Sequence, residues 1–162
     1  MPVTNVAHDV DSRTLTIVAE FAAPKARVWQ IYADPRQLEK VWGPPEFPAT
    51  IVDHSLAPGG RVNYYMTGPN GEKYCGYWVV TAVDEPNGFT FDDGFADEDF
   101  NPVEAMPVSS NVYTFTEADG RTTATFVSTF ETAEGLQKVL DMGVVEGSTG
   151  AINQIDALLA DG

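Results

Sequence analysis

The sequence contains very little cysteine and histidine. Cys75 is its one cysteine, so a disulfide within the chain is excluded, and this usage is compatible with a reducing compartment. The two histidines, His8 and His54, are far apart, and such a set cannot supply the ligands of a tight transition-metal site. Asp53 and His54 point to opposite faces of a strand, which argues against a histidine-based dyad. We therefore expect no metal and no cofactor.

Basic residues are also scarce. Lys and Arg number 9 against 24 Asp and Glu, which gives a formal net charge of −15. A surface of this kind repels phosphate backbones and anionic lipid, so we expect neither nucleic acid nor a membrane surface as a partner. Solubility explains the acidity by itself; the alternative is that the charge steers a cationic ligand.

Long apolar runs and the signatures of common active sites are absent as well. No apolar segment approaches the roughly 20 residues that span a bilayer, and the first residues do not begin a secretory signal, so we expect a cytoplasmic location. There is no Gly-x-Ser-x-Gly elbow, and Pro58-Gly59-Gly60 precedes a strand, unlike a phosphate-binding loop. The acidic run from Asp92 to Asp99 lacks EF-hand spacing and is interpreted as solvated, and residues 93–109 are interpreted as a long loop or a flap.

The sequence does contain a series of short strands separated by turns. Apolar residues alternate from Thr14 to Phe21, which predicts a half-buried first strand, whereas residues 1–12 have little periodicity and are expected to fray. Turn sequences such as Ala118-Asp119-Gly120 punctuate the middle of the chain. They delimit six further strands, which short connections make antiparallel, over residues 49–56, 61–67, 73–83, 88–92, 110–118 and 121–132.

Helical spacing occurs in two parts of the chain. After Pro24, apolar residues at helical spacing predict a short helix, which Asp34-Pro35 ends before a second short helix over about residues 35–40. From about Ala133 to Ala160, apolar residues recur at intervals of three and four, which predicts one long C-terminal helix with Thr132 as its cap; the alternative is that its first turns form a separate helix.

This order predicts a single α+β domain over residues 1–162. A curved antiparallel sheet of about seven strands, with two short helices after the first strand, needs a cover, and the C-terminal helix is the long amphipathic element that can provide it. The space between helix and sheet stays open unless large side chains fill it. Gly143, Gly147 and Gly150 fall along one side of this helix, each at a cost of roughly 1 kcal/mol relative to alanine. Either close backbone contact or room for a ligand would offset that cost.

Several short motifs resemble one known family. Phe21-Ala22-Ala23-Pro24, Asp34-Pro35 and Trp42-Gly43-Pro44 resemble the opening of the Hsp90-ATPase-activator-homologue (AHSA1-like) family, and Met142-Gly143 through Glu146-Gly147 resembles its C-terminal helix. That family belongs to the START/Bet v 1-like (SRPBCC) superfamily, which includes polyketide cyclases. The resemblance implies a helix-grip fold, and it implies binding of apolar or aromatic small molecules, with catalysis in a few members.

The predicted ligand-binding residues are those expected to face the cavity. Tyr64 has a hydroxyl that could orient a ligand carbonyl or act as a weak acid, and Trp78 is placed inward, in phase with Gly76. For any single one of these residues, the alternative of an ordinary core residue is the favoured interpretation. The full set is Trp42, Tyr64, Met66, Trp78, Phe91, Phe95, Phe126, Ser128, Met142, Gly143 and Gly147.

Three functions remain open at this stage. The first is a carrier or sensor that binds a small apolar, aromatic molecule. The second is a cyclase, dehydratase or hydrolase that uses Tyr64 or a pocket carboxylate, and it requires a buried ionisable group with a displaced pKa facing the cavity. The third is a co-chaperone-like protein interaction, which requires a contiguous apolar patch outside the cavity. A homodimer through an exposed edge strand is also possible.

Overall fold

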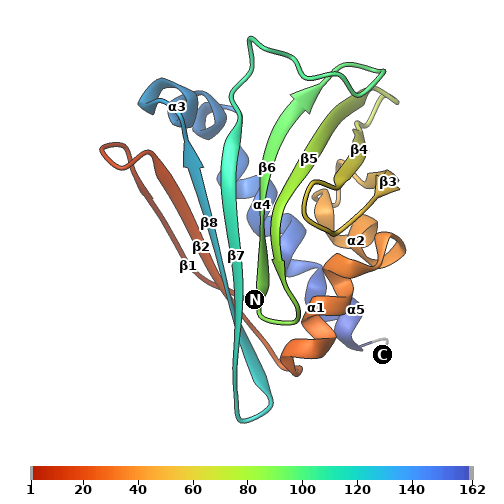
Figure 1. Cartoon of the computed structure of the whole chain (residues 1–162), viewed down its shortest axis with the longest axis vertical. Helices are drawn as coiled ribbons and strands as arrows, with labels where there is room; N and C mark the ends of the chain where they lie inside the picture. The colour runs from red at the N-terminus through yellow and green to blue at the C-terminus, as the bar shows by residue number, and fades with distance from the viewer. Residues whose placement is uncertain (1, 161–162) are drawn as a thin grey trace.

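The computed structural model describes residues 2–160, and its centre is an antiparallel sheet of eight strands (Figure 1). The strands follow the order β1-β2-β8-β7-β6-β5-β4-β3 across the sheet. Their bounds are β1 Val3–Asp9, β2 Thr14–Phe21, β3 Ala49–His54, β4 Arg61–Thr67, β5 Lys73–Asp84, β6 Gly88–Ala96, β7 Ser109–Ala118 and β8 Arg121–Phe130.

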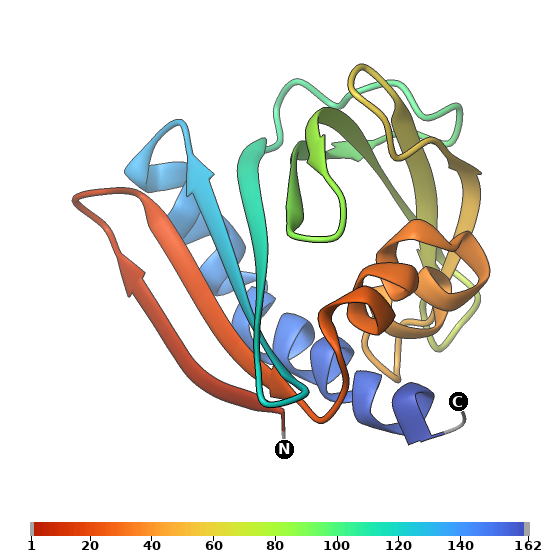
Figure 2. The same cartoon turned by 60° about the horizontal axis from the view of Figure 1, so that its bottom comes forward.

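Helices occupy the two positions that the sequence predicts. Helices α1 (Lys25–Ala33) and α2 (Pro35–Trp42) join β2 to β3, and the Asp34 side chain caps α2 by accepting from the Arg36 backbone N–H at 2.9 Å. Helices α3 (Ala133–Asp141), α4 (Val144–Asn153) and α5 (Ile155–Ala160) follow β8. Figure 2 shows them crossing the open side of the curled sheet, between the β1–β2 hairpin and α1–α2. This arrangement confirms the α+β helix-grip architecture.

The N-terminal residues form a strand, so the expectation that residues 1–12 fray was wrong. Strand β1 pairs along β2 from Val3 opposite Ala19 to Asp9 opposite Thr14. Most of its side chains are exposed, because β1 lies at the edge of the sheet and only Val3 and Val6 pack against the core. An edge strand with so little burial has no apolar alternation to reveal it.

The C-terminal cover consists of three helices in the described chain, so the single long helix was wrong, and the alternative that its first turns are separate is confirmed by α3. Thr132 caps α3 as expected, with its Oγ1 accepting from the Gly135 N–H at 2.9 Å. The break follows at Gly143, whose φ of +88° is left-handed backbone that glycine adopts without strain. Gly143 therefore ends one helix and precedes the next, and a pattern of apolar spacing does not show such a bend.

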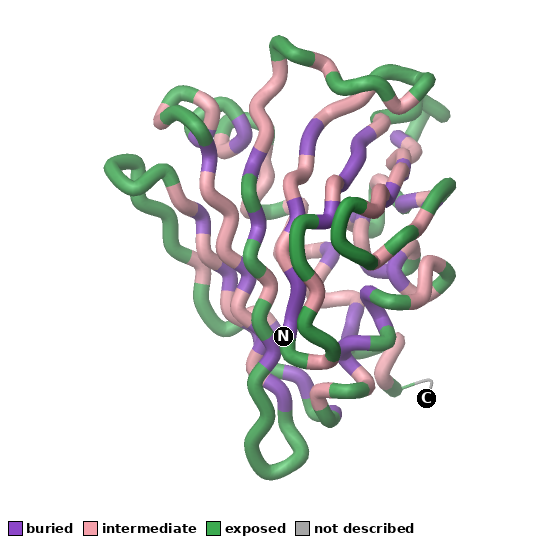
Figure 3. Tube along the Cα trace, in the orientation of Figure 1, coloured by how far each residue is buried: buried purple, intermediate pink, exposed green. Residues whose placement is uncertain are grey.

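Strand β6 is longer than predicted. It continues to Ala96, which pairs with Cys75 of β5, so residues 93–96 belong to the sheet and not to a loop. The connection to β7 begins only at Asp97. In Figure 1 this connection is the long loop at the top of the view, and it is mostly exposed or half-buried in Figure 3.

The interior contains two apolar clusters. The larger one packs α1 and α2 on the sheet through an aromatic group in which Trp78 stacks on Phe91 at 4.1 Å between ring centroids. The smaller one joins α3 to the ends of β2 and β8 through Leu15, Phe130, Leu136 and Val139. No helix among the described residues is long and apolar enough to cross a membrane.

Candidate functional site

A cavity of about 320 Å³ lies between the concave face of the sheet and helices α3 and α4. It is partly open, and its wall comes from five strands, from all helices except α5, and from the segments around Pro44 and Pro107. The wall residues are Leu15, Ile17, Tyr32, Val41, Trp42, Pro44, Tyr64, Met66, Asp93, Phe95, Pro107, Ser109, Asn111, Tyr113, Phe126, Ser128, Phe130, Val139, Val144, Gly147, Ser148, Ala151 and Ile152.

The structure places most of the predicted ligand-binding residues in this wall. They are Trp42, Tyr64, Met66, Phe95, Phe126, Ser128 and Gly147. Trp78 and Phe91 point to the same face of the sheet but lie in the aromatic cluster under α1 and α2, where each is at most 1% exposed. Met142 and Gly143 are outside the wall: Met142 is 55% exposed at the end of α3, and Gly143 forms the bend after it.

The glycines of the C-terminal segment have three different environments. The positive φ at position 143 favours glycine over any other residue. A Cβ on Gly150 would be 3.7 Å from Pro44 and from Pro45, which is ordinary close packing of α4 on that turn. A Cβ on Gly147 would meet no atom within 4 Å, since this residue borders the cavity. Close contact with another backbone therefore explains neither Gly147 nor Gly150, and open space is found only at Gly147.

The cavity contains a carboxyl group that the sequence analysis assigned to a solvated loop. Asp93 lies on β6 and accepts a hydrogen bond from the Tyr64 hydroxyl at 2.8 Å. Burial raises the pKa of Asp93 to about 7, and the bond from Tyr64 acts in the opposite direction. Burial, and then the nearby charge of Asp93, raises the pKa of Tyr64 well above its usual value, so the phenol stays protonated.

A signal for Asp93 is present in the sequence. Phe89, Phe91, Asp93 and Phe95 alternate along β6, and their shared phase places all four on the concave face. The acidic residues at 97–99 obscure this alternation, because they make the whole segment resemble a solvated loop. If the alternation of Phe89 and Phe91 is continued past residue 92, it places the carboxyl of Asp93 between the rings of Phe91 and Phe95 along the strand.

Gly76 allows Tyr64 to reach Asp93. Tyr64 is on β4 and Asp93 is on β6, with β5 between these strands. Gly76 of β5 pairs with Tyr64, and a Cβ at position 76 would overlap the Tyr64 ring, with Cε2 only 2.9 Å away. The missing side chain therefore opens the path along which the phenol crosses β5.

Gly76→Ala is expected to displace the Tyr64 ring and break its bond to Asp93. The clash should cost about 1–3 kcal/mol of unfolding free energy. Because the Tyr64 bond lowers the pKa of Asp93, losing it should raise that pKa above about 7. Urea unfolding and an NMR titration of the Asp93 carboxyl measure both effects. Cys75→Ala, one residue away on the opposite face, is the control, and an unaltered Asp93 titration in Gly76→Ala would contradict the role of Gly76.

The other polar groups of the wall bond to one another. The Ser128 hydroxyl donates to Oδ1 of Asn111 at 2.6 Å, and the Asn111 amide donates to Oγ of Ser109 at 3.1 Å. Asn111 and Ser109 are buried, so these bonds meet their hydrogen-bonding needs inside the protein. Together with Asp93, which pairs across the sheet with Ser109, they form a polar strip on an otherwise apolar surface.

One wall residue keeps an unmet donor. The indole N–H of Trp42 is buried and has no hydrogen-bond partner within the described chain. The Trp42 ring meets the Tyr64 ring edge to face at 5.7 Å, so this donor belongs to the same side of the cavity as the Tyr64–Asp93 pair. His54, in contrast, is structural: its Nε2 donates to the Tyr32 carbonyl at 2.9 Å.

The described residues contain no group of three or more side chains that could hold a metal ion.

A comparison with protein families identifies the family of this chain: the model for the Activator of Hsp90 ATPase homolog 1-like protein family matches residues 22–160. The chain belongs to this family. The match covers both short helices, four of the five cavity strands and the C-terminal cover, so the family resemblance read from the motifs is confirmed.

Solved structures show how this member of the Activator of Hsp90 ATPase homolog 1-like family relates to others. Protein Ms6760 from Mycobacterium smegmatis is 73% identical over 98% of this chain and 97% of its own, with a TM-score of 0.91. A protein from Arthrobacter aurescens is 46% identical over 99% of this chain and 93% of its own, with a TM-score of 0.94.

A more distant structure shares the fold alone. The AHSA1 protein from Silicibacter pomeroyi is 21% identical over 91% of this chain and 97% of its own, with a TM-score of 0.71. No curated protein sequence matches the chain significantly. The family and the fold are therefore shown by the comparisons, and the function is argued from the cavity.

Proposed function

We propose that this protein binds a small apolar or aromatic molecule in the cavity between the sheet and α4. Ligand pockets are typically concave, apolar and roughly 300–1,000 Å³ in volume, with a few convergent polar groups. A cavity of about 320 Å³ lies at the lower end of that range, which suits a ligand of one or two rings. The aromatic and aliphatic wall supplies apolar contact, and the carboxyl of Asp93 supplies a polar group that can orient a ligand.

The observation that carries this proposal is the open space in front of Gly147. A glycine inside a helix is unfavourable by roughly 1 kcal/mol relative to alanine, and no close backbone contact compensates for it here. The same helix uses Ala151 as a second small wall residue. Small residues on the cover and large ones on the sheet leave a volume that a ligand can fill.

A catalytic role is the second candidate, and Asp93 is the specific observation that favours it. A buried ionisable group facing a cavity, with its pKa displaced toward neutrality, is what an acid–base enzyme requires. Asp93 satisfies this description, and the Tyr64 hydroxyl that donates to it fixes the position of the carboxyl in the cavity. Loss of turnover in Asp93→Asn, with ligand binding retained, would support catalysis; retained turnover would exclude Asp93 as the acid or base.

The co-chaperone-like alternative has no comparable observation in its favour. The large apolar side chains that are exposed are spread over separate elements: Val10, Val52, Tyr74, Val112 and Met142. The membership of the family does not by itself assign a partner, because function follows from sites and not from folds.

Native mass spectrometry of freshly purified protein, combined with thermal unfolding, tests the binding proposal. A molecule bound only by the folded state at about 100 times its dissociation constant adds about 2.7 kcal/mol of stability. We therefore expect either a co-purified small molecule or a clear rise in Tm with naphthalene-sized aromatic compounds. A protein that carries no small molecule, and whose Tm is unchanged by a panel of apolar compounds, would contradict the proposal.

A further inference from the structure

Asp93 is the one charged residue in the described cavity wall. No Lys, Arg or His lines the cavity, so no protein cation faces this carboxyl from the wall. Its Oδ1 accepts from Tyr64, and no described residue donates to its Oδ2. Asp93 is half-buried, because part of its surface faces the cavity. The ionised form of this carboxyl therefore lacks the counter-charge that a buried anion needs.

We propose that the ligand of this cavity is a cationic amine on an aromatic or alicyclic body, whose N–H donates to Oδ2 of Asp93. This inference rests on the proposed binding function and specifies its ligand class. A protonated amine supplies both missing features, a positive charge and a hydrogen-bond donor. Its apolar body takes the remaining volume against the wall of the cavity.

The rings around Asp93 favour the same ligand class. Tyr64 and Tyr113 line the cavity beside Asp93, and Trp42 packs edge to face on Tyr64. A cation near the faces of such rings is attracted by their quadrupoles. Ser109, Asn111 and Ser128 meet their own hydrogen-bonding needs, so they do not compete strongly for the ligand.

The other titratable groups in the described cavity wall are phenols and are neutral around pH 7. Tyr64 on β4 and Tyr113 on β7 face the carboxyl, and burial raises the pKa of both well above the usual value. Tyr77 on β5 also senses the charge of Asp93, and its pKa is raised as well, mainly by burial. The wall residues of α3 and α4 carry no ionisable side chain. Asp93 is therefore the group whose charge changes near neutral pH.

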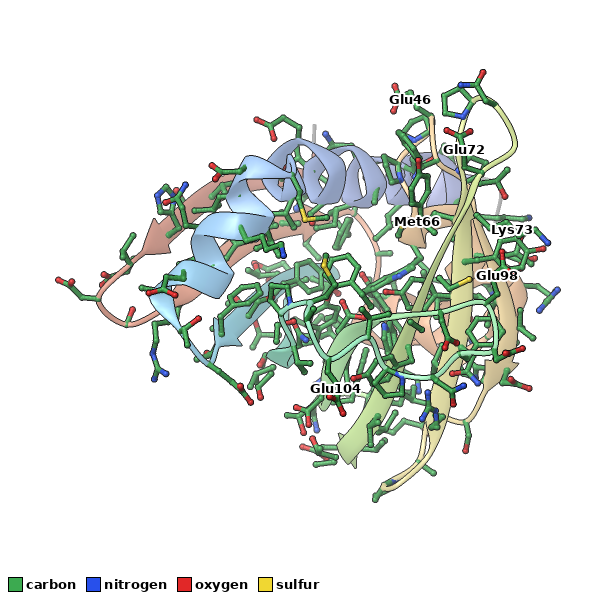
Figure 4. The ribbon with its side chains drawn as sticks, turned by 90° about the horizontal axis from the view of Figure 1, so that it is seen from above. Glu46, Met66, Glu72, Lys73, Glu98 and Glu104 are labelled. Atoms are coloured by element: carbon green, nitrogen blue, oxygen red, sulfur yellow. The ribbon has the colours of Figure 1, made fainter. Side chains whose placement is uncertain are left out.

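The outer charge of the protein agrees with a cationic ligand. The net charge of −15 raises the local concentration of cations around the molecule. Figure 4 labels Glu46, Glu72 and Glu98 on the same side of the fold as the wall residue Met66. Lys73, also labelled there, lies over the Tyr65 ring at 4.6 Å and is not a wall residue.

Calorimetric titration with three probes of one shape tests the inference: 1-naphthylmethylamine, 1-naphthalenemethanol and 1-naphthoate. At pH 8 and constant ionic strength we expect the amine to bind at least ~10-fold more tightly than the alcohol, and the naphthoate to bind most weakly. Between pH 6 and pH 8 the ionised fraction of Asp93 rises ~10-fold, so the affinity for the amine should rise by about the same factor while that for the alcohol stays constant.

Two variants that remove the same charge complete the test. Asp93→Asn should equalise the amine and the alcohol, whereas Asp92→Asn should keep the preference, because Asp92 bonds to Ser110 on the outer face. An amine that binds no better than the alcohol in the wild type would overturn the inference and leave the proposed function standing. Equal losses in both variants would also overturn it, since long-range charge would then explain the preference. Failure of all three probes counts against the binding proposal itself.

Discussion

Gly147→Phe is expected to abolish ligand binding while leaving the protein folded. The Cβ position of residue 147 points into open space, so a benzyl group can enter the cavity and occupy the volume of a one-ring ligand. Replacing glycine with phenylalanine within a helix also recovers part of the roughly 1 kcal/mol that glycine costs relative to alanine. Any residual overpacking should cost no more than about 1–3 kcal/mol.

The measurement compares ligand-induced Tm shifts in three proteins. The wild type should be stabilised by a naphthalene-sized ligand, and Gly147→Phe should show no shift with the same compound. Glu146→Phe adds the same ring one residue earlier, where the native side chain is exposed, and it should keep the wild-type response. A Gly147→Phe protein that folds and still binds would place the ligand elsewhere, and one that fails to fold would show that α4 packs directly on the sheet.

Asp93→Asn is expected to stabilise the protein above pH 7 and to remove part of its pH dependence. The pKa of Asp93 is raised from 3.8 to about 7, so the folded protein binds this proton more tightly than the unfolded chain does. The free energy of unfolding must therefore fall as the pH rises from about 4 to about 7, and it should be level above that range with respect to this group. Asparagine has no charge to bury, and its Oδ1 can still accept from Tyr64.

The size of this effect follows from the shift in pKa. We expect the variant to gain on the order of 2–4 kcal/mol over the wild type at pH 8 and little at pH 4. Urea unfolding at both pH values measures the difference, with Asp92→Asn as the control for net charge. If the two variants respond alike, or if Asp93→Asn is less stable at pH 8, then Asp93 is not a buried carboxyl with a raised pKa.

Elements with a strong local pattern could be predicted from the sequence. The turn at Asp119-Gly120, where both residues have positive φ, and the caps at Asp34 and Thr132 depend on neighbouring residues alone. Strand β1 could not be predicted, because hydrogen bonds to β2 define it while its side chains are mostly exposed. The position of the bend at Gly143 could not be predicted either, because a straight helix and a bent helix have the same spacing of apolar residues.

The site could be predicted only for residues that face the concave side of the sheet and also lie where no helix covers that side. Tyr64 and Phe126 line the cavity because their strands cross its floor, whereas Trp78 is in phase with Tyr64 but lies beneath α2. Which part of a concave face is filled depends on where the helices dock, and a strand's own sequence does not contain this information. The link between Tyr64 and Asp93 likewise depends on Gly76 of a third strand, so it becomes visible only with the register.

The division of the interior into two clusters has a consequence for how the molecule opens. The larger cluster holds α1, α2 and α5 through residues such as Ile155, while the smaller one holds α3 mainly through Leu136 and Val139. The cavity borders both clusters, because its wall includes Ile17 and Tyr32 from one and Leu15 and Phe130 from the other. Helix α3 is thus anchored by a smaller cluster than α1, α2 and α5, so we expect it to open locally at a lower free energy than the sheet. A bound ligand would contact both clusters and so hold α3 against the sheet. We therefore expect hydrogen exchange in α3 to slow more than elsewhere when the cavity is filled.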